Sequence, residues 1–206
     1  MAGLRLFSMP SSGNSYKVRL MLSLLGLNYE HISCENGSDA LADAKASGNA
    51  PMGKLPALHL PDGQILSESN AILCYLAQGT SWLPDDGLEQ ARMLSWMFFE
   101  QNRHEPIIAV RASLRTYPER AHLATPARMA ELLDSGYAVL ALMEDHLADN
   151  TWFAGQQASV ADIALYAYTH TAGSRGGYDM TRFPNIRAWV SRIAAMPNYV
   201  GLDDIP

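Results

Sequence analysis

The first 80 residues alternate short apolar runs with stretches of helical periodicity. Residues 4–7 form an apolar run typical of a strand. Residues 15–25 carry apolar side chains at positions 18, 21, 22 and 25, which is the spacing of an amphipathic helix, and Gly26 stands where such a helix would end. Residues 28–33 include β-forming side chains and predict a second strand. The pattern therefore predicts a strand, a helix and a strand in that order.

A hairpin and another helix follow in the pattern. Residues 56–60 and 64–68 are strand-like and are joined by Pro61-Asp62-Gly63, a strong turn signal. Residues 69–77 then show helical spacing. The order β-α-β followed by β-β-α is typical of a thioredoxin-like α/β domain, which we place at residues 1–79.

The pattern changes after this point. Residues 80–87 contain Pro, Gly and acidic residues without periodicity and are interpreted as a linker. Residues 88–206 show only helical patterns. Pro106 stands inside a long helical region, 88–115, which it should bend or split because proline has no N–H to donate.

Three further helix starts can be identified in the second half. Thr125-Pro126 has the form of an N-cap followed by a first-turn proline, and Phe183-Pro184 opens the last helix. Ser159 and Asp162 have the spacing of a capping box in front of an apolar helix. The predicted fold class is thus an α/β thioredoxin-like domain followed by an all-α helical bundle.

Composition and charge narrow the classes of function. The chain has 206 residues, is 48% hydrophobic and carries a net charge of −6, which gives no basic field for nucleic acid. Its apolar runs fall short of the roughly 20 residues that span a bilayer, and the N-terminus does not have the pattern of a secretory signal. Cys34 and Cys74 lack metal-ligand spacing and are interpreted as core thiols. We expect a cytoplasmic protein without a structural metal.

Polar clusters mark two helix starts. Ser11, Ser12 and Asn14 lie in the segment PSSGNS, between the first strand and its helix. Glu68 and Ser69 lie in SESN, where a strand meets the helix at 69–77. A helix N-terminus offers unpaired N–H groups that suit a carboxylate, and a carboxylate at Glu68 could hold an ammonium group. The alternative is that these serines only cap their own helices.

Four segments carry a resemblance to a known family. The resemblance extends over nearly the whole chain and rests on the segments PSSGNSYKVRLMLSLLGLNYE, NAPMGKLPALHLPDGQILSESNAILCYLA, EQNRHEPIIAV and TWFAGQQASVADIALYAYTH. Together they resemble the cytosolic-type glutathione S-transferases. The closer similarity is to bacterial members with a hydroxyl residue at the active site, and not to those that use tyrosine or cysteine.

The resemblance implies that the sulfur of glutathione is the nucleophile, so the protein must stabilise a thiolate. Lowering a thiol pKa by about two units takes roughly 2.7 kcal/mol, which one hydroxyl donor and a helix N-terminus can supply. By its place in the motif Ser12 is the first choice as donor, with Asn14 as a second donor and Ser11 as the fallback. Tyr16 is a rival but is expected to cover the outer surface of its helix.

The remaining glutathione contacts are also implied by the resemblance. Leu55 would exchange backbone hydrogen bonds with the cysteinyl part, with a cis bond before Pro56. Glu68 and Ser69 would hold the γ-glutamyl ammonium and carboxylate, and Lys54 is a candidate for the glycyl carboxylate. The chain departs from the family in two places: it has Gly53 where some relatives have histidine and Asn70 where some have arginine.

An electrophile pocket is expected on the first long helix of the helical domain. The residues assigned to it are Phe99, Arg103, Ile107 and Arg111. His104 and Glu105 invite an acid-base interpretation, but adjacent helical residues point about 100° apart, so at least one of them should serve packing or a surface ion pair. Most of the aromatic side chains Tyr166, Tyr168 and Tyr178 are expected in the core or in an interface.

The leading hypothesis is transfer of glutathione to electrophilic, largely apolar small molecules. One alternative is glutathione-dependent reduction of disulfides or peroxides, which needs the same thiolate. Another is a non-catalytic interaction protein that has kept the fold, although the SES segment argues against it. The family resemblance also implies a homodimer.

Overall fold

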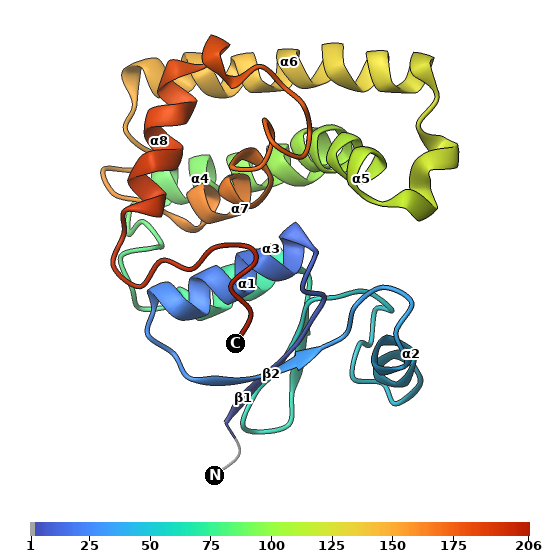
Figure 1. Ribbon diagram of the computed structural model, residues 1–206. Coiled ribbons are helices and arrows are strands. Elements are labelled where there is room, and N and C mark those ends of the chain that lie inside the picture. The colour runs from blue at the N-terminus through green and yellow to red at the C-terminus, as the bar shows by residue number, and fades with distance from the viewer. Residues whose placement is uncertain (1–2) are drawn as a thin grey trace. The chain divides into compact units, whose positions relative to one another are not determined.

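The computed structural model describes residues 3–206, which fold into two compact units (Figure 1). The first unit contains the chain up to Thr80 together with residues 194–206. The second contains Ser81–Ile193. The first boundary lies at the start of the expected linker at 80–87. The expected helical domain, 88–206, differs at its end because residues 194–206 pack with the first unit.

A four-stranded mixed sheet forms the centre of the first unit. Its strands are β1 (Leu4–Ser8), β2 (Tyr29–Ser33), β3 (Ala57–His59) and β4 (Ile65–Ser67). They lie in the order β2-β1-β3-β4, with β1 parallel to β2 and antiparallel to β3, and β3 antiparallel to β4. Parallel neighbours need a crossover, and the helix between β1 and β2 provides it. The predicted strands and hairpin are confirmed.

The helices of this unit cover both faces of the sheet. They are α1 (Gly13–Leu24), α2 (Asp39–Ala46) and α3 (Ser69–Leu76). Successive side chains of a strand point to opposite faces, and β1 shows this directly. Leu6 packs in one cluster with Val18 of α1 and Ile72 of α3. Phe7, its neighbour, packs with Leu41 of α2. Therefore α1 and α3 share one face, and α2 covers the other.

Helix α2 was not predicted from the sequence. Ser38 caps it by accepting a hydrogen bond from the N–H of Leu41, and Gly48 follows its end. Only Leu41 and Ala44 are buried, and apart from Leu41 the apolar residues of the helix are alanines, which give no clear helical stripe. The Ser38 cap was the signal for this helix in the sequence, and the helix otherwise depends on packing against the sheet.

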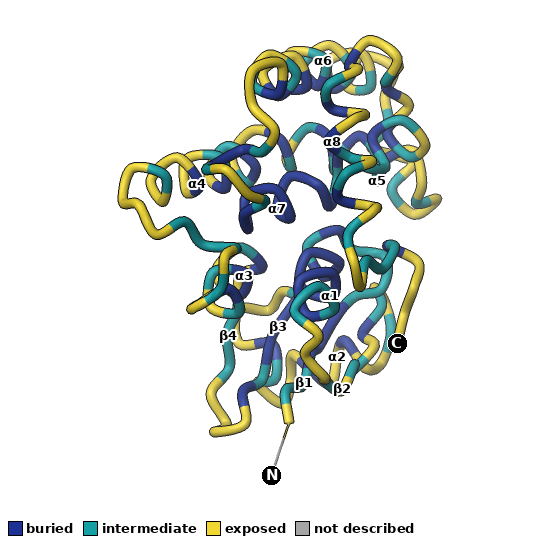
Figure 2. The backbone as a smooth tube through the Cα atoms, turned by 90° about the vertical axis from the view of Figure 1, so that its left-hand side faces the viewer, coloured by how far each residue is buried: buried dark blue, intermediate teal, exposed yellow. Residues whose placement is uncertain are grey.

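The second unit contains only helices. They are α4 (Gly87–Phe99), η1 (Glu100–Ala109), α5 (Val110–Thr116), η2 (Pro118–Leu123), α6 (Pro126–Asp149), α7 (Val160–Thr169), η3 (Met180–Arg182) and α8 (Pro184–Ala194). The segment η1 is a π-helix that contains Pro106, so the regular α-helical pattern is interrupted where the sequence predicts a bend or a split. Helix α7 is the most deeply buried of them, as the dark tube in Figure 2 shows.

The predicted helix starts of this unit are confirmed. Thr125 caps α6 by accepting from the N–H of Arg128. Ser159 and Asp162 form both bonds of the capping box before α7, and Asp162 also accepts from Phe153 N–H and from the indole of Trp189. Burial raises the pKa of Asp162 to about 6 although these hydrogen bonds lower it. The carboxylate therefore joins three segments of the core.

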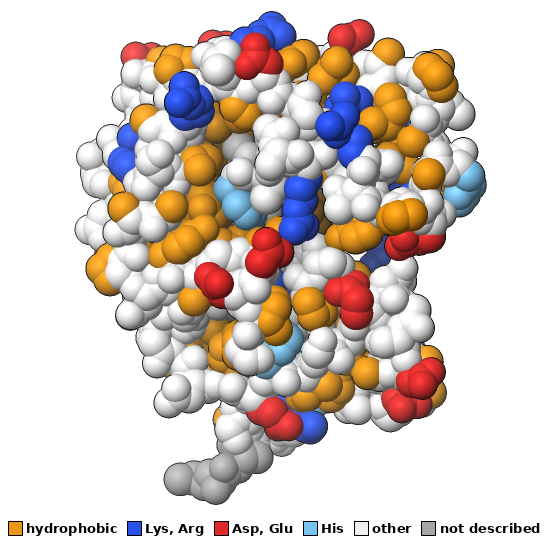
Figure 3. Space-filling view, in the orientation of Figure 1, with side chains coloured by type: hydrophobic (Ala, Val, Ile, Leu, Met, Phe, Trp, Pro, Cys, Tyr) orange, Lys and Arg blue, Asp and Glu red, His pale blue; other side chains and the backbone are white. Residues whose placement is uncertain are grey.

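The charge on the surface and the apolar character of the helices add two observations. On the face drawn in Figure 3, Lys and Arg side chains are interspersed with acidic and uncharged ones. Within residues 3–206, no helix combines the length and the apolar character needed to cross a bilayer.

Candidate active site

The loop from Met9 to Ser12 connects β1 to α1 and carries two of the predicted thiolate donors, Ser11 and Ser12, while Asn14 lies in the first turn of α1. The N–H of Met9 donates to Ser15 Oγ at 3.0 Å, and the N–H of Ser12 donates to the carbonyl of Met9 at 3.1 Å. Both bonds are local, so the polar residues of PSSGNS shape the loop as well as offering donors. The chain leaves this loop directly into α1.

Ser12 stands at the N-cap of α1 with extended backbone angles. Its Oγ accepts from the N–H of Ser15 at 3.4 Å, a long bond that uses a lone pair and leaves the hydroxyl proton available. The predicted cap and the predicted donor are therefore compatible in one side chain. The N–H groups of the first turn of α1 lie beside it and favour an anion.

Ser11 is used differently. Its hydroxyl donates to one carboxylate oxygen of Glu35 at 2.7 Å, and its N–H donates to the other at 3.0 Å. Burial alone raises the pKa of Glu35. The N–H of Asn36, both donors of Ser11 and the charge of Arg19 nevertheless bring that pKa below its ordinary value. In this arrangement the Ser11 proton is committed to Glu35.

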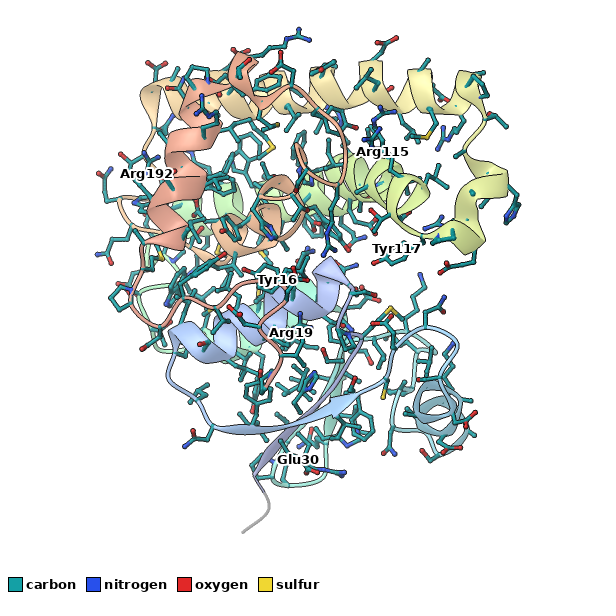
Figure 4. The ribbon with its side chains drawn as sticks, in the orientation of Figure 1. Tyr16, Arg19, Glu30, Arg115, Tyr117 and Arg192 are labelled. Atoms are coloured by element: carbon teal, nitrogen blue, oxygen red, sulfur yellow. The ribbon has the colours of Figure 1, made fainter. Side chains whose placement is uncertain are left out.

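Tyr16 points toward the C-terminal segment. Its side chain is fully buried, and its hydroxyl donates to the carbonyl of Val200 at 2.8 Å and lies 3.3 Å from the hydroxyl of Tyr199. Figure 4 shows it on α1 beside that segment. These contacts occupy the phenol and weaken its case as the thiolate donor.

Arg19 is a buried cation beneath the loop that the sequence interpretation missed. It is 1% exposed, and its guanidinium bonds to the hydroxyl of Ser8 and to the carbonyls of Met9, Pro10 and Leu202. Burial lowers its pKa, yet a guanidinium remains charged at physiological pH. The available signal was a charged residue beside the apolar stripe of the predicted helix.

The second polar cluster meets the first through side chains. Ser69 is 4% exposed, and its hydroxyl donates to Asn14 Oδ1 at 3.3 Å. It forms no cap on its own helix, where Glu68 is the N-cap residue and makes no side-chain bond to the helix. The alternative that Ser69 only caps α3 is therefore not supported, and the two predicted clusters lie together.

Glu68 has an unusual backbone conformation. Its φ is +66°, which is uncommon for a residue other than glycine, and its side chain is exposed. Strained backbone of this kind persists only where the surrounding structure holds it. The conformation connects β4 to α3 and leaves the carboxylate in solvent beside the start of α3.

The segment before β3 was predicted to face glutathione through its backbone. The Leu55-Pro56 bond is cis, as considered from the sequence. Leu55 lies two residues before β3 and outside its ladder with β1, while Lys54 is exposed. Gly53 has a φ of +69°, a conformation that favours glycine over a side chain such as histidine.

The helical residues predicted for the electrophile pocket differ in exposure. Arg103 is exposed with its guanidinium 5.6 Å from the centre of the Phe99 ring, and Ile107 is half-buried. Arg111 is buried, and its guanidinium donates to the carbonyls of Gly176, at 2.8 Å, and Met129. These bonds to carbonyls give Arg111 a role in packing, so its assignment to the pocket stays a prediction.

The neighbouring histidine and aromatic residues are mostly structural. His104 is fully buried with Nε2 2.9 Å from the hydroxyl of Thr169, whereas Glu105 is only half-buried. Tyr166 and Tyr178 are buried, as expected of core aromatics. In the described part of the chain, no group of three or more His, Cys, Asp or Glu side chains could hold a metal ion.

Family models match both units. Residues 6–81 match the glutathione S-transferase N-terminal domain, and residues 110–197 match the glutathione S-transferase C-terminal domain. The two matches together include most of the site residues described above.

Individual proteins agree with these matches. A glutathione S-transferase structure from Pseudomonas fluorescens is 40% identical, with a TM-score of 0.91 over 98% of this chain and 100% of that one. A glutathione transferase from Burkholderia graminis, with two glutathione molecules bound per subunit, is 26% identical, with a TM-score of 0.83 over 98% of this chain and 88% of that one. The Ure2 protein of Eremothecium gossypii is 27% identical over 96% of this chain. The chain spans 66% of the length of that relative.

Proposed function

Because the chain belongs to the glutathione S-transferase family, we propose that it transfers glutathione to electrophilic, largely apolar small molecules. The observation that carries this proposal is the state of Ser12. Its hydroxyl stands at the N-terminus of α1, keeps its proton available and adjoins a loop that is held by other residues. A donor in that position can stabilise a thiolate.

The proposed reaction has two steps at the sulfur. The thiol of bound glutathione loses its proton to solvent, and the thiolate accepts a hydrogen bond from Ser12. The sulfur lone pair then attacks the electrophilic carbon and forms the C–S bond, while the leaving group departs with its electron pair or the electrons move onto an acceptor atom. The positive charge of Arg19 and the helix N-terminus favour the anion before attack.

The rest of the tripeptide has partners in the first unit. The exposed carboxylate of Glu68 is suited to the γ-glutamyl ammonium, and Ser69 with the start of α3 to its carboxylate. The backbone of Leu55 is suited to the cysteinyl amide because it lies outside the ladder of β3. Asn14 joins this part of the site to the thiolate loop, and Lys54 is the partner proposed for the glycyl carboxylate.

For the electrophile, we propose Phe99, Arg103, Ile107 and Arg111 as lining residues. Phe99 and Ile107 offer apolar surface that is not fully buried, and Arg103 lies over the Phe99 ring. A few such contacts change the preference between substrates by only about 1 to 3 kcal/mol each, so selectivity depends on their sum.

A second candidate function is glutathione-dependent reduction of disulfides. The relative with two glutathione molecules per subunit favours it, because net reduction of a disulfide consumes two glutathione molecules and yields glutathione disulfide. The glutathione thiolate beside Ser12 would attack one sulfur of the disulfide, and the other sulfur would leave as a thiolate. The thiolate of a second glutathione would then attack the glutathionyl sulfur of the mixed disulfide, which forms glutathione disulfide and releases the second substrate thiolate.

The test is a pH titration of bound glutathione, followed by the ultraviolet absorbance of the thiolate. We expect the native protein to form thiolate well below pH 8.5, the ordinary value of a free thiol, and Ser12→Ala to lose most of that shift and about 10- to 100-fold in kcat/KM. Retention on glutathione-agarose with an unshifted thiol would support the non-catalytic alternative. Turnover of a disulfide and not of a conjugation substrate would favour the second candidate.

A further inference from the structure

We propose that Arg19 is a positioning residue for the thiolate loop and that the C-terminal segment at Leu202 completes its setting. This inference rests on the proposed function, since it concerns how the loop that presents Ser12 is held. Arg19 lies on the second turn of α1, and it bonds to both the loop and the C-terminal segment.

The guanidinium of Arg19 contacts three backbone carbonyls and one serine hydroxyl. Nη1 donates to Ser8 Oγ at 3.0 Å and approaches the Met9 carbonyl at 3.5 Å. Nη2 donates to the carbonyl of Pro10 at 3.1 Å and to that of Leu202 at 2.9 Å. A planar guanidinium presents five N–H donors in a fixed fork and can meet several fixed acceptors at once, whereas a lysine ammonium has three donors on a single nitrogen.

Arg19 and Ser12 share one of these acceptors, the carbonyl of Met9. The Met9 carbonyl that Arg19 approaches also accepts the N–H of Ser12 at 3.1 Å, and the N–H of Met9 is held by Ser15. On the other side of the loop, Glu35 holds Ser11 through two hydrogen bonds. The loop is therefore held from both sides, with Arg19 as the buried member.

The C-terminal segment, residues 194–206, supplies one of the acceptors of the buried Arg19 guanidinium. Arg19 is 1% exposed, and Leu202, whose carbonyl it meets, is 6% exposed. Without that carbonyl, Nη2 would lose one of its two acceptors. Figure 4 shows Arg19 on α1 where residues 194–206 return to the first unit. We infer that the segment contributes to the site by fixing the guanidinium that fixes the loop.

The experiment compares three full-length variants. Arg19→Met removes all the donors, and Ser8→Ala removes one acceptor and leaves the charge in place. Ser23→Ala is the matched control, because Ser23 is on the same helix and bonds to the C-terminal segment at Asn198 without touching the loop. Folding is checked by circular dichroism and thermal unfolding.

Two readouts are measured. We expect Arg19→Met to raise the pKa of the bound glutathione thiol by about one unit, which is a tenfold loss of thiolate at a pH below that value. KM for glutathione should change less than kcat. Amide exchange at Ser12, measured without glutathione, should be faster in Arg19→Met and, to a smaller degree, in Ser8→Ala, and unchanged in Ser23→Ala.

The outcomes separate this inference from the proposed function. An unshifted thiol in the native protein overturns the proposed function, while amide exchange still tests whether Arg19 holds the loop. A shifted thiol that is the same in native protein and folded Arg19→Met overturns the inference alone, as do equal effects in Ser23→Ala. If Arg19→Met does not fold, native-like exchange and thiol pKa in Ser8→Ala overturn it.

Discussion

Ser11 and Ser12 are adjacent and chemically identical, yet their hydroxyl groups have different roles. The Ser11 hydroxyl donates its hydrogen bond to Glu35, while the Ser12 hydroxyl accepts from Ser15 and has its proton available to donate. The sequence could nominate both and rank them only by resemblance. The difference depends on Glu35, which is distant in the sequence and is brought to the loop by the pairing of β1 with β2.

Tyr16 gives a prediction that separates the rival donors. Tyr16→Phe removes the hydrogen bond to Val200 and should cost about 0.5 to 1.5 kcal/mol of the free energy of unfolding. The pKa of bound glutathione should not change, because the phenol faces the C-terminal segment. Urea denaturation and thiolate absorbance are the measurements, and a large rise in the thiol pKa would show that Tyr16 is the donor after all.

Glu35 gives a prediction on pH. Its pKa in the folded protein lies below its ordinary value of 4.5, so the stabilisation by its charged form is present above about pH 4.5 and is lost as pH falls through the lower folded value. The difference in unfolding free energy between native protein and Glu35→Gln should be constant from pH 5 to 7 and shrink toward pH 3. Urea denaturation at several pH values checks this, and a constant difference down to pH 3 would contradict it.

At the scale of elements, helix starts are the features that sequence predicted best. The capping box before α7 and the first-turn prolines each act within a few residues of the helix start, so these signals do not depend on tertiary context. Helix α2 shows the opposite case: with two buried positions it depends on the sheet beneath it. Pro106 is intermediate, because its effect was predictable but the π-helical form of η1 was not.

The capping box before α7 gives a prediction with a matched control. Asp162→Asn keeps one acceptor oxygen but turns an amide group toward donors, and it should cost about 2 to 4 kcal/mol of the free energy of unfolding. Asp86 caps α4 at the surface, where asparagine caps equally well, so Asp86→Asn should change stability by less than about 0.5 kcal/mol. Equal effects in urea denaturation would mean that the bonds of Asp162 to Phe153 and Trp189 add nothing.

At the scale of the whole molecule, we expect a homodimer that uses the outer face of α4. Leu94 and Phe98 lie one turn apart on that helix and are 40% and 63% exposed, which is unusual for neighbouring large apolar side chains. Phe98→Glu should convert a dimer into a monomer of 22.6 kDa, measured by light scattering after size-exclusion chromatography. Leu142→Glu, at an exposed leucine of α6, is the control. A monomeric native protein would contradict the prediction.

The two boundaries between the units differ in how far the sequence predicts them. The composition of residues 80–87 predicts a linker, because the segment has no apolar periodicity, and the division of the structure into units falls after Thr80. Nothing in the local pattern of residues 194–206 indicates that they pack with the first unit. Their backbone carbonyls accept hydrogen bonds from Tyr16, Arg19 and Ser23, three donors that lie on one side of the helix only once α1 has folded.

The sequence by itself determined the strands, most helices, the helix starts and the two polar clusters, because each depends on periodicity or on contacts a few residues apart. Only the tertiary structure decided which serine hydroxyl has its proton available to donate to a ligand. It also decided where the Tyr16 phenol points and that Arg19 lies beneath the loop. These depend on partners brought together across the sheet and from the far end of the chain. Hydrogen bonds have a range of about 3 Å, so they are decided by the final placement of the backbone.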